Sequence, residues 1–156
     1  MKAAKDVIKA GTKAADGSVF AGLTPDGKQH IYVMPKDLGV TLRFNEAAER
    51  VAQLNTAKAL GHNDWQIPSL EILRILQKNQ NEGSLKGAFN TTGDKSDASG
   101  GFPGWYWSST PANYDYPTVM PEVAHFRFSD GINGWSCKDS LYLGCCPVRL
   151  VPLKRL

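Results

Sequence analysis

With 156 residues, of which 42% are hydrophobic and 21% charged, the chain has the composition of a single globular domain. Its formal net charge of +3 is carried by scattered Lys and Arg residues, a pattern that does not favour a nucleic-acid partner. The apolar runs are too short to span a membrane, so we expect no membrane partner. Lysines interrupt residues 1–17, where a signal peptide would need an apolar stretch, so the sequence predicts a cytoplasmic protein, with a place in a virion left open.

The first predicted element is a β-hairpin over residues 18–34. Residues 1–17, rich in Ala, Lys and Gly, are expected to form a short helix or a loose arm before a single domain over 18–156. Two short apolar runs, 18–23 and 30–34, flank a segment containing Pro and Gly, which is typical of two strands joined by a turn.

Two helices are predicted next, over about 45–60 and 69–79. In the first, Asn45 is expected to cap the start and Gly61 to follow the end. Ser69 is a suitable N-cap for the second helix, whose Leu and Ile residues form a broad apolar face. Trp65, in the turn between the helices, is expected in the core.

The rest of the chain predicts a long loop followed by short strands. Residues 83–104 are rich in Gly, Ser, Thr, Asn and Asp, with a few apolar anchors. Strands are predicted at 105–110, 123–128, 134–138, 141–143 and 147–151. Two helices packed on short antiparallel or mixed strands with long loops make an α+β fold, in which the first strands are expected to pair with the last.

Several motifs in this order resemble the Lcl C-terminal domain family. They are Asp-Trp-Gln-Ile-Pro-Ser-Leu-Glu at 64–71, Tyr-Trp-Ser-Ser-Thr at 106–110, Val-x-x-Phe-x-Phe-x-x-Gly at 123–131 and Val-Arg-Leu-Val at 148–151. The resemblance covers about residues 40–152. It implies a C-type-lectin-like fold related to formylglycine-generating-enzyme domains, in a family found at the end of a collagen-like bacterial adhesin and in bacterial and phage proteins. The family has no common function, so the resemblance does not supply one.

Catalytic and metal-binding motifs are weak. A copper oxidase of the formylglycine-generating type would need paired thiolates from Cys137, Cys145 and Cys146. Cys145 and Cys146 are adjacent and would point to opposite faces of a strand, so a shared site would have to pair Cys137 with one of them, Cys145 in the alternative kept open. We expect small buried thiols instead. Zinc-ligand spacing around His125 is absent, as are the loops that C-type lectins use for calcium. We therefore expect no cofactor and no enzymatic activity, with a thiol- or metal-dependent enzyme as an alternative.

Aromatic and polar residues near the late strands predict a binding surface instead. Tyr and Trp offer a large contact area at low entropic cost, and Asn, Asp and Lys offer adaptable hydrogen bonds. In the C-type-lectin-like fold this region faces the ligand, and a protein or a carbohydrate is the expected partner. The predicted ligand-binding residues are Tyr106, Asn113, Tyr114, Asp115, Tyr116, Asn133, Trp135, Lys138, Asp139 and Tyr142.

Two other interpretations of these aromatic residues stay open. They could simply pack the long loops onto the sheet. Separately, Tyr106 and Trp107 alternate on one strand, so one of the two is expected in the core. They could also form the subunit interface of a homo-oligomeric structural or interaction protein, encoded by a phage or mobile element.

Overall fold

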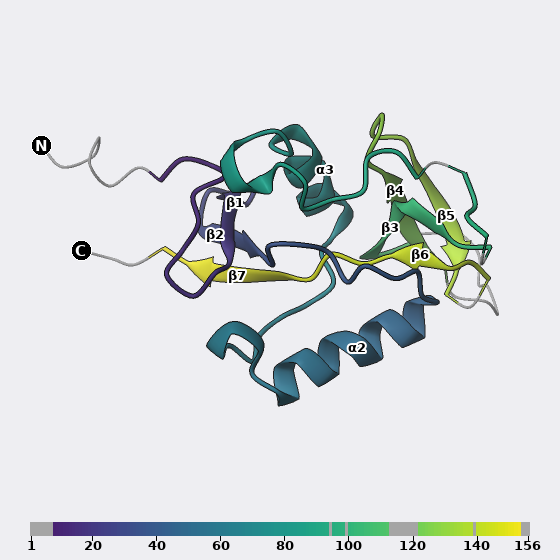
Figure 1. Cartoon of the computed structure of the whole chain (residues 1–156), viewed down its shortest axis with the longest axis horizontal. Helices are drawn as coiled ribbons and strands as arrows, with labels where there is room; N and C mark the ends of the chain where they lie inside the picture. The colour runs from purple at the N-terminus through teal and green to yellow at the C-terminus, as the bar shows by residue number, and fades with distance from the viewer. Residues whose placement is uncertain (1–7, 94, 99, 113–121, 139, 154–156) are drawn as a thin grey trace, which may run out of the picture.

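The computed structural model describes residues 8–93, 95–98, 100–112, 122–138 and 140–153. It confirms the α+β class, with two helices and two small sheets (Figure 1). Within the described residues no helix is both long enough and apolar enough to cross a membrane. In chain order the elements are β1 (Val19–Leu23), β2 (Gln29–Val33), α2 (Phe44–Thr56), the 3₁₀ turn η1 (Ala59–Gly61), α3 (Leu70–Lys78), the 3₁₀ turn η2 (Gly83–Leu85), β3 (Phe102–Pro111), β4 (Glu122–Arg127), β5 (Asn133–Cys137), β6 (Leu143–Gly144) and β7 (Val148–Pro152).

The predicted hairpin and its pairing with the end of the chain are both present. β1 and β2 are antiparallel, and β2 pairs on its other side with β7, giving the order β1-β2-β7. Val33 lies opposite both Val19 and Val148, so three valines cross this sheet in one row. The segment before β1 is neither a helix nor loose over residues 8–17, because Gly11 donates to Phe20 O at 2.7 Å and accepts from Ser84 N at 2.9 Å.

The second sheet has the order β5-β4-β3-β6 and is mixed. β3 is antiparallel to β4 and β4 to β5, whereas β6 runs parallel to β3. Figure 1 shows the two sheets at opposite ends of the long axis, with α3 between them and α2 along the lower side. The C-terminal segment crosses from β6 in one sheet to β7 in the other.

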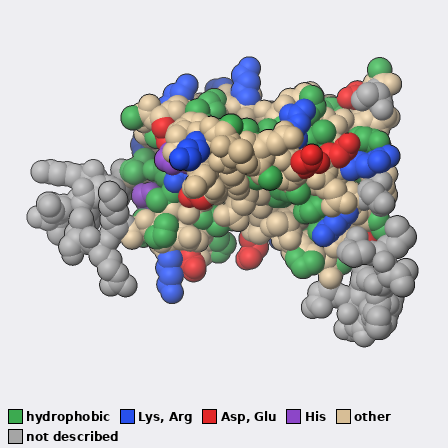
Figure 2. All heavy atoms as spheres, turned by 90° about the horizontal axis from the view of Figure 1, so that it is seen from below, with side chains coloured by type: hydrophobic (Ala, Val, Ile, Leu, Met, Phe, Trp, Pro, Cys, Tyr) green, Lys and Arg blue, Asp and Glu red, His purple; other side chains and the backbone are tan. Residues whose placement is uncertain are grey.

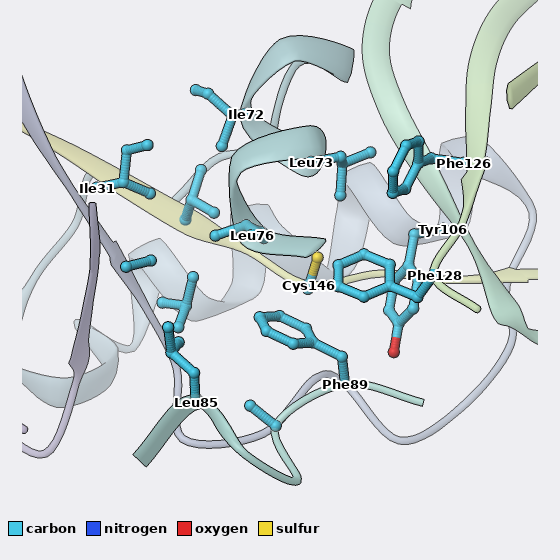
Figure 3. Packing of buried hydrophobic residues seen from close by; sticks show 14 of the residues in the cluster. Ile31, Ile72, Leu73, Leu76, Leu85, Phe89, Tyr106, Phe126, Phe128 and Cys146 are labelled. Atoms are coloured by element: carbon cyan, nitrogen blue, oxygen red, sulfur yellow. The ribbon is translucent and has the colours of Figure 1, made fainter. Parts of the chain in front are cut away.

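Helix α3 lies in the larger hydrophobic core. Ser69 caps it as predicted, because its Oγ accepts a hydrogen bond from Ile72 N at 3.3 Å. Leu73 and Leu76 are fully buried against residues of both sheets (Figure 3). The predicted apolar face therefore joins the two sheets into one core.

Helix α2 starts and ends earlier than predicted. Its first residue is Phe44, its N-cap is Arg43 and its last residue is Thr56, so Asn45 is not the cap. The chain leaves the helix because Lys58 takes the left-handed conformation with φ 50°, the role expected of Gly61. Gly61 is instead the last residue of the 3₁₀ turn η1, with φ 86°.

Strand β3 is buried on both faces. Tyr106 and Trp107 are both fully buried, whereas the alternating pattern predicted only one of them in the core. Tyr106 belongs to the α3 core, and Trp107 to a second core with Trp65, Ala47 and other residues from α2 to β6. A strand in the middle of a sheet that is covered on both faces has no side in contact with solvent. The alternation of residues along the strand does not show whether both faces are covered.

Candidate ligand-binding site

Five of the ten predicted ligand-binding residues lie outside the described residues. These are Asn113, Tyr114, Asp115, Tyr116 and Asp139. The other five occupy three different settings, which determine what each could contribute to a site.

Tyr106 is placed in the core. Its ring packs edge-on against Phe128 at 4.9 Å and Phe89 at 6.4 Å, and its hydroxyl points past Phe89 to the loops (Figure 3). That hydroxyl donates to Asp37 Oδ2 and accepts from Asn90 N at 2.7 Å. Burial, and then the negative charge of Asp37, raise the pKa of Tyr106, so the phenol stays protonated. Tyr106 positions two other residues and is not itself a surface contact.

Trp135 and Asn133 share one face of the edge strand β5. Trp135 is 43% exposed, although the strand pairs it with the fully buried Ala124. Asn133 Oδ1 accepts from Arg74 Nη2 of α3 at 3.1 Å, so this face borders the outer side of that helix. Ile132, just before the strand, is 52% exposed. The edge of the sheet therefore presents apolar area beside hydrogen-bonding groups.

Lys138 and Tyr142 lie against the start of α2. The Lys138 ammonium is 5.0 Å from the centre of the Phe44 ring, and the Arg43 guanidinium is 5.0 Å from the centre of the Tyr142 ring. Phe44 N also donates to Lys138 O at 2.9 Å. These contacts attach α2 to the second sheet, so both residues have a structural role whether or not they touch a ligand.

The face on which α2 lies carries both signs of charge. Figure 2 shows Lys and Arg side chains there interspersed with Asp and Glu side chains, together with small hydrophobic areas. On this face the basic residues do not gather into the stripe that typifies proteins binding a nucleic-acid backbone.

A cavity of about 610 Å³ lies among three loops that the sequence did not single out. Its lining comes from residues 36, 37 and 39–41 before α2, residues 87–90 after η2, and Asp97, Pro103 and Gly144. None of the ten predicted residues lines it, although Tyr106 holds two that do. The sequence gives little indication of this cavity, because Asp37 and Asn90 look like ordinary turn residues.

Asp37 is fixed in the cavity wall from both sides. Its Oδ1 accepts from Gly39 N at 2.8 Å, and its Oδ2 accepts from the buried Tyr106 hydroxyl. Its own N–H donates to Ala88 O at 3.0 Å, which ties the first loop to the second. Because Tyr106 also accepts from Asn90 N, one core hydroxyl orients polar residues on two loops.

The cysteines are free thiols in the core or beside it. Cys145 and Cys146 point into different cores, as their adjacency predicts. Burial, and then Asp37, raise the pKa of Cys145 to about 12, and burial also raises that of Cys146. Cys137, on β5, is part-buried, and its Sγ lies 3.9 Å from Glu122 Oε2.

His125 faces the side of the second sheet opposite to Phe126, as predicted. Its ring lies 4.8 Å from the Trp105 ring, and a Cβ on Gly134 would come within 2.7 Å of it. Burial lowers its pKa, which favours the neutral imidazole. Nowhere among the described residues do three or more His, Cys, Asp or Glu side chains gather as metal ligands would.

The two most specific motifs of the sequence meet in space. Gln66 and Val148 exchange two backbone hydrogen bonds of 2.9 Å, and Arg149 bonds the Asp64 carboxylate. Trp65 is buried between them and α2, with its indole N–H on Ala59 O at 2.9 Å and its backbone held by Asn55. The Asp-Trp motif thus stabilises the fold, as the prediction that placed Trp65 in the core requires.

The arrangement defines an α+β domain of two helices and two small sheets, in which a Trp-containing turn pairs with the last strand. The sequence model of the Lcl C-terminal domain family matches residues 17–149, and the chain belongs to that family. No curated protein matches the chain.

Proposed function

We propose that this protein is a non-enzymatic recognition module whose ligand contacts the β5 edge of the second sheet. The observation that carries the proposal is the 43% exposure of Trp135, the one described tryptophan that is exposed to this degree. Trp65 and Trp107 are buried in the core, where they stabilise the fold. An exposed tryptophan costs solubility, and such residues are enriched at the energetic centres of binding surfaces.

Polar side chains beside this tryptophan could form the rim of the binding surface. Arg74 and Asn133 are already oriented toward each other beside it, so a partner would meet a preformed hydrogen-bonding pair. Tyr114 and Tyr116, which lie outside the described residues, are kept in the proposed site for the contact area that aromatic side chains offer. The ligand class proposed for it is a protein, with a carbohydrate as the alternative.

The cysteine geometry disfavours the thiol-enzyme alternative. A thiolate is the form that attacks a substrate, and burial raises the pKa of the Cys145 thiol to about 12, so without a metal ion this thiol is protonated at neutral pH. Cys146 points to the opposite core, so the adjacent pair cannot chelate one ion. A C-type-lectin-like identity for the fold is also proposed, on the two helices packed against short strands with long loops.

The test compares the triple variant Tyr114→Ala, Tyr116→Ala, Trp135→Ala with the wild type. A partner captured by wild-type protein is identified by mass spectrometry, and its dissociation constant is measured for both proteins by calorimetry. The variant is expected to bind at least about tenfold more weakly, because large aromatic side chains dominate such interfaces.

The matched control is Leu23→Ala, which removes a side chain of similar exposure, 45%, from β1 in the other sheet. It should leave the affinity unchanged. Unchanged affinity in a folded triple variant would exclude this surface as the binding site. A self-association measured by sedimentation and lost in the triple variant would instead assign the surface to a homo-oligomer interface.

A further inference from the structure

The cavity among the three loops has a chemistry of its own and shares no lining residue with the β5 surface. Its volume of about 610 Å³ falls within the range of sites that take small molecules. Its lining is mixed: Val40, Phe89 and Pro103 are apolar, and charged side chains stand beside them. Such a mixture of apolar wall and a few placed polar groups typifies a ligand site rather than a packing defect.

Charges of both signs line the cavity. Asp37 and Asp97 supply carboxylates, and Lys36, next to Asp37 in the chain, supplies an ammonium. A simple anion would meet the two carboxylates, and a simple cation would meet the ammonium. A molecule carrying both charges satisfies both requirements, since each of its ends has an opposite charge available.

The polar groups are held ready for such a molecule. The Asp37 carboxylate is fixed by Gly39 N–H and the Tyr106 hydroxyl, and an ionised carboxylate with two such bonds can still accept another. Asn90 uses its Oδ1 to accept from Thr92 N and Gly93 N, which orients its NH₂ group as a donor. The Lys36 ammonium forms no hydrogen bond or ion pair with any residue in the described part of the chain.

We infer that this cavity binds a short zwitterionic peptide with free termini. Its ammonium group bonds the Asp37 carboxylate, and its carboxylate bonds the Lys36 ammonium and the Asn90 amide. Its apolar side chains lie on Phe89, Pro103 and Val40. The volume leaves room for more than one residue, which favours a peptide over a single amino acid.

The probe is a degenerate tripeptide mixture, added to the full ¹⁵N-labelled chain and followed by NMR. The same mixture is prepared with acetylated N-termini and, separately, with amidated C-termini. The free mixture should shift amide resonances at residues 36–41 and 87–90. Blocking either end should weaken binding about tenfold, the loss expected for one charge-assisted hydrogen bond.

Lys36→Gln identifies the group that reads the carboxylate. The variant should bind the free mixture about tenfold more weakly and the amidated mixture as wild type does, because the two changes remove the same interaction. Lys36 is exposed, so this change leaves the fold intact. Lys28→Gln, at an exposed lysine of the β1–β2 turn, should bind the free mixture as the wild type does.

Three results would overturn the inference. They are no shift at millimolar free mixture, shifts confined to other residues, and binding that survives the blocking of either terminus. Each of them leaves the affinity comparison of the triple variant unchanged, so the failure of this inference is distinguishable from failure of the proposed recognition function.

Discussion

Helices α2 and α3 are consecutive in the chain but are attached to the rest of the molecule by different forces. α3 buries Leu70, Ile72, Leu73 and Leu76 between the two sheets, whereas α2 buries only Ala47 and Val51. α2 depends in addition on polar contacts at its ends, which include two cation–π pairs at its start and the Asn55 side chain bonded to the Trp65 backbone at its end. The α3 side therefore supplies most of the buried apolar contact of the fold, and the α2 side is a cover fixed at its ends.

Truncating one leucine on each helix tests this difference most strongly. Leu73→Ala should lower the free energy of unfolding by about 3–4 kcal/mol, because it leaves a cavity in a fully enclosed core. Leu54→Ala, at a half-buried position of α2, should cost about 1 kcal/mol. Urea denaturation of both variants measures the two values. Equal losses would mean that the two helices contribute alike.

The hydroxyl at the edge of the α3 core is the next test. Tyr106→Phe leaves the Asp37 carboxylate and the Asn90 N–H each without one partner, so it should lower the free energy of unfolding by about 2 kcal/mol. Tyr32→Phe, whose hydroxyl has no described partner, is the control and should stay within about 0.5 kcal/mol of wild type. A Tyr106→Phe variant as stable as this control would show that the hydroxyl does not hold the cavity loops.

Acid should weaken the contact that fixes the chain beyond α2. His62, after η1, lies 2.7 Å from Asp16, and burial alone would raise the Asp16 pKa. Hydrogen bonds from Ser18 and His62 outweigh burial and lower that pKa from 3.8 to about 2. A carboxyl with a lower pKa in the folded state adds stability that is complete above pH 3.8 and lost as the pH falls to about 2.

Asp16→Asn should therefore reduce stability near neutral pH by about 1 kcal/mol, after allowance for partial exposure, and by almost nothing near pH 2. Thermal unfolding at a series of pH values measures the difference. Glu49→Gln, at an exposed carboxylate of α2, is the control. A constant difference across this range would contradict the assignment.

The smallest expected effect belongs to the cation–π contact at the start of α2. Lys138→Ala should lower the free energy of unfolding by about 0.5 kcal/mol, the value usual for such a pair at the surface. Lys28→Ala should change nothing measurable. A loss above about 2 kcal/mol would show that α2 is fixed more firmly than its buried area indicates.

The elements that local chemistry controls were predicted from the sequence. Ser69 capped α3 as expected, and the alternation of Ala124, Phe126 and Phe128 placed one face of β4 in the core. The end of α2 was misplaced because Gly61 is the residue that most readily adopts a positive φ, yet Lys58 adopts it first. Tertiary contacts around Trp65 outweighed that local preference.

The site was harder to predict than the fold. Tyr106 is buried because other elements cover both faces of β3. The residue pattern of β3 by itself does not indicate which elements pack on its two faces. The cavity is assembled from residues 36, 37, 39–41, 87–90, 97, 103 and 144, which have no shared periodicity. Trp135, a predicted contact residue, is 43% exposed on the edge strand β5.

The crossing of the chain from β6 to β7 has a consequence for the order of folding during synthesis. β2 gains its second neighbour only from β7, and β3 gains its parallel neighbour from β6. Both strands are made more than 30 residues after β3 begins, and β7 more than 110 after β2 ends. A ribosome must therefore deliver residues 143–152 before either sheet has all its strands, and until then β2 and β3 each leave one edge unpaired and open to other chains.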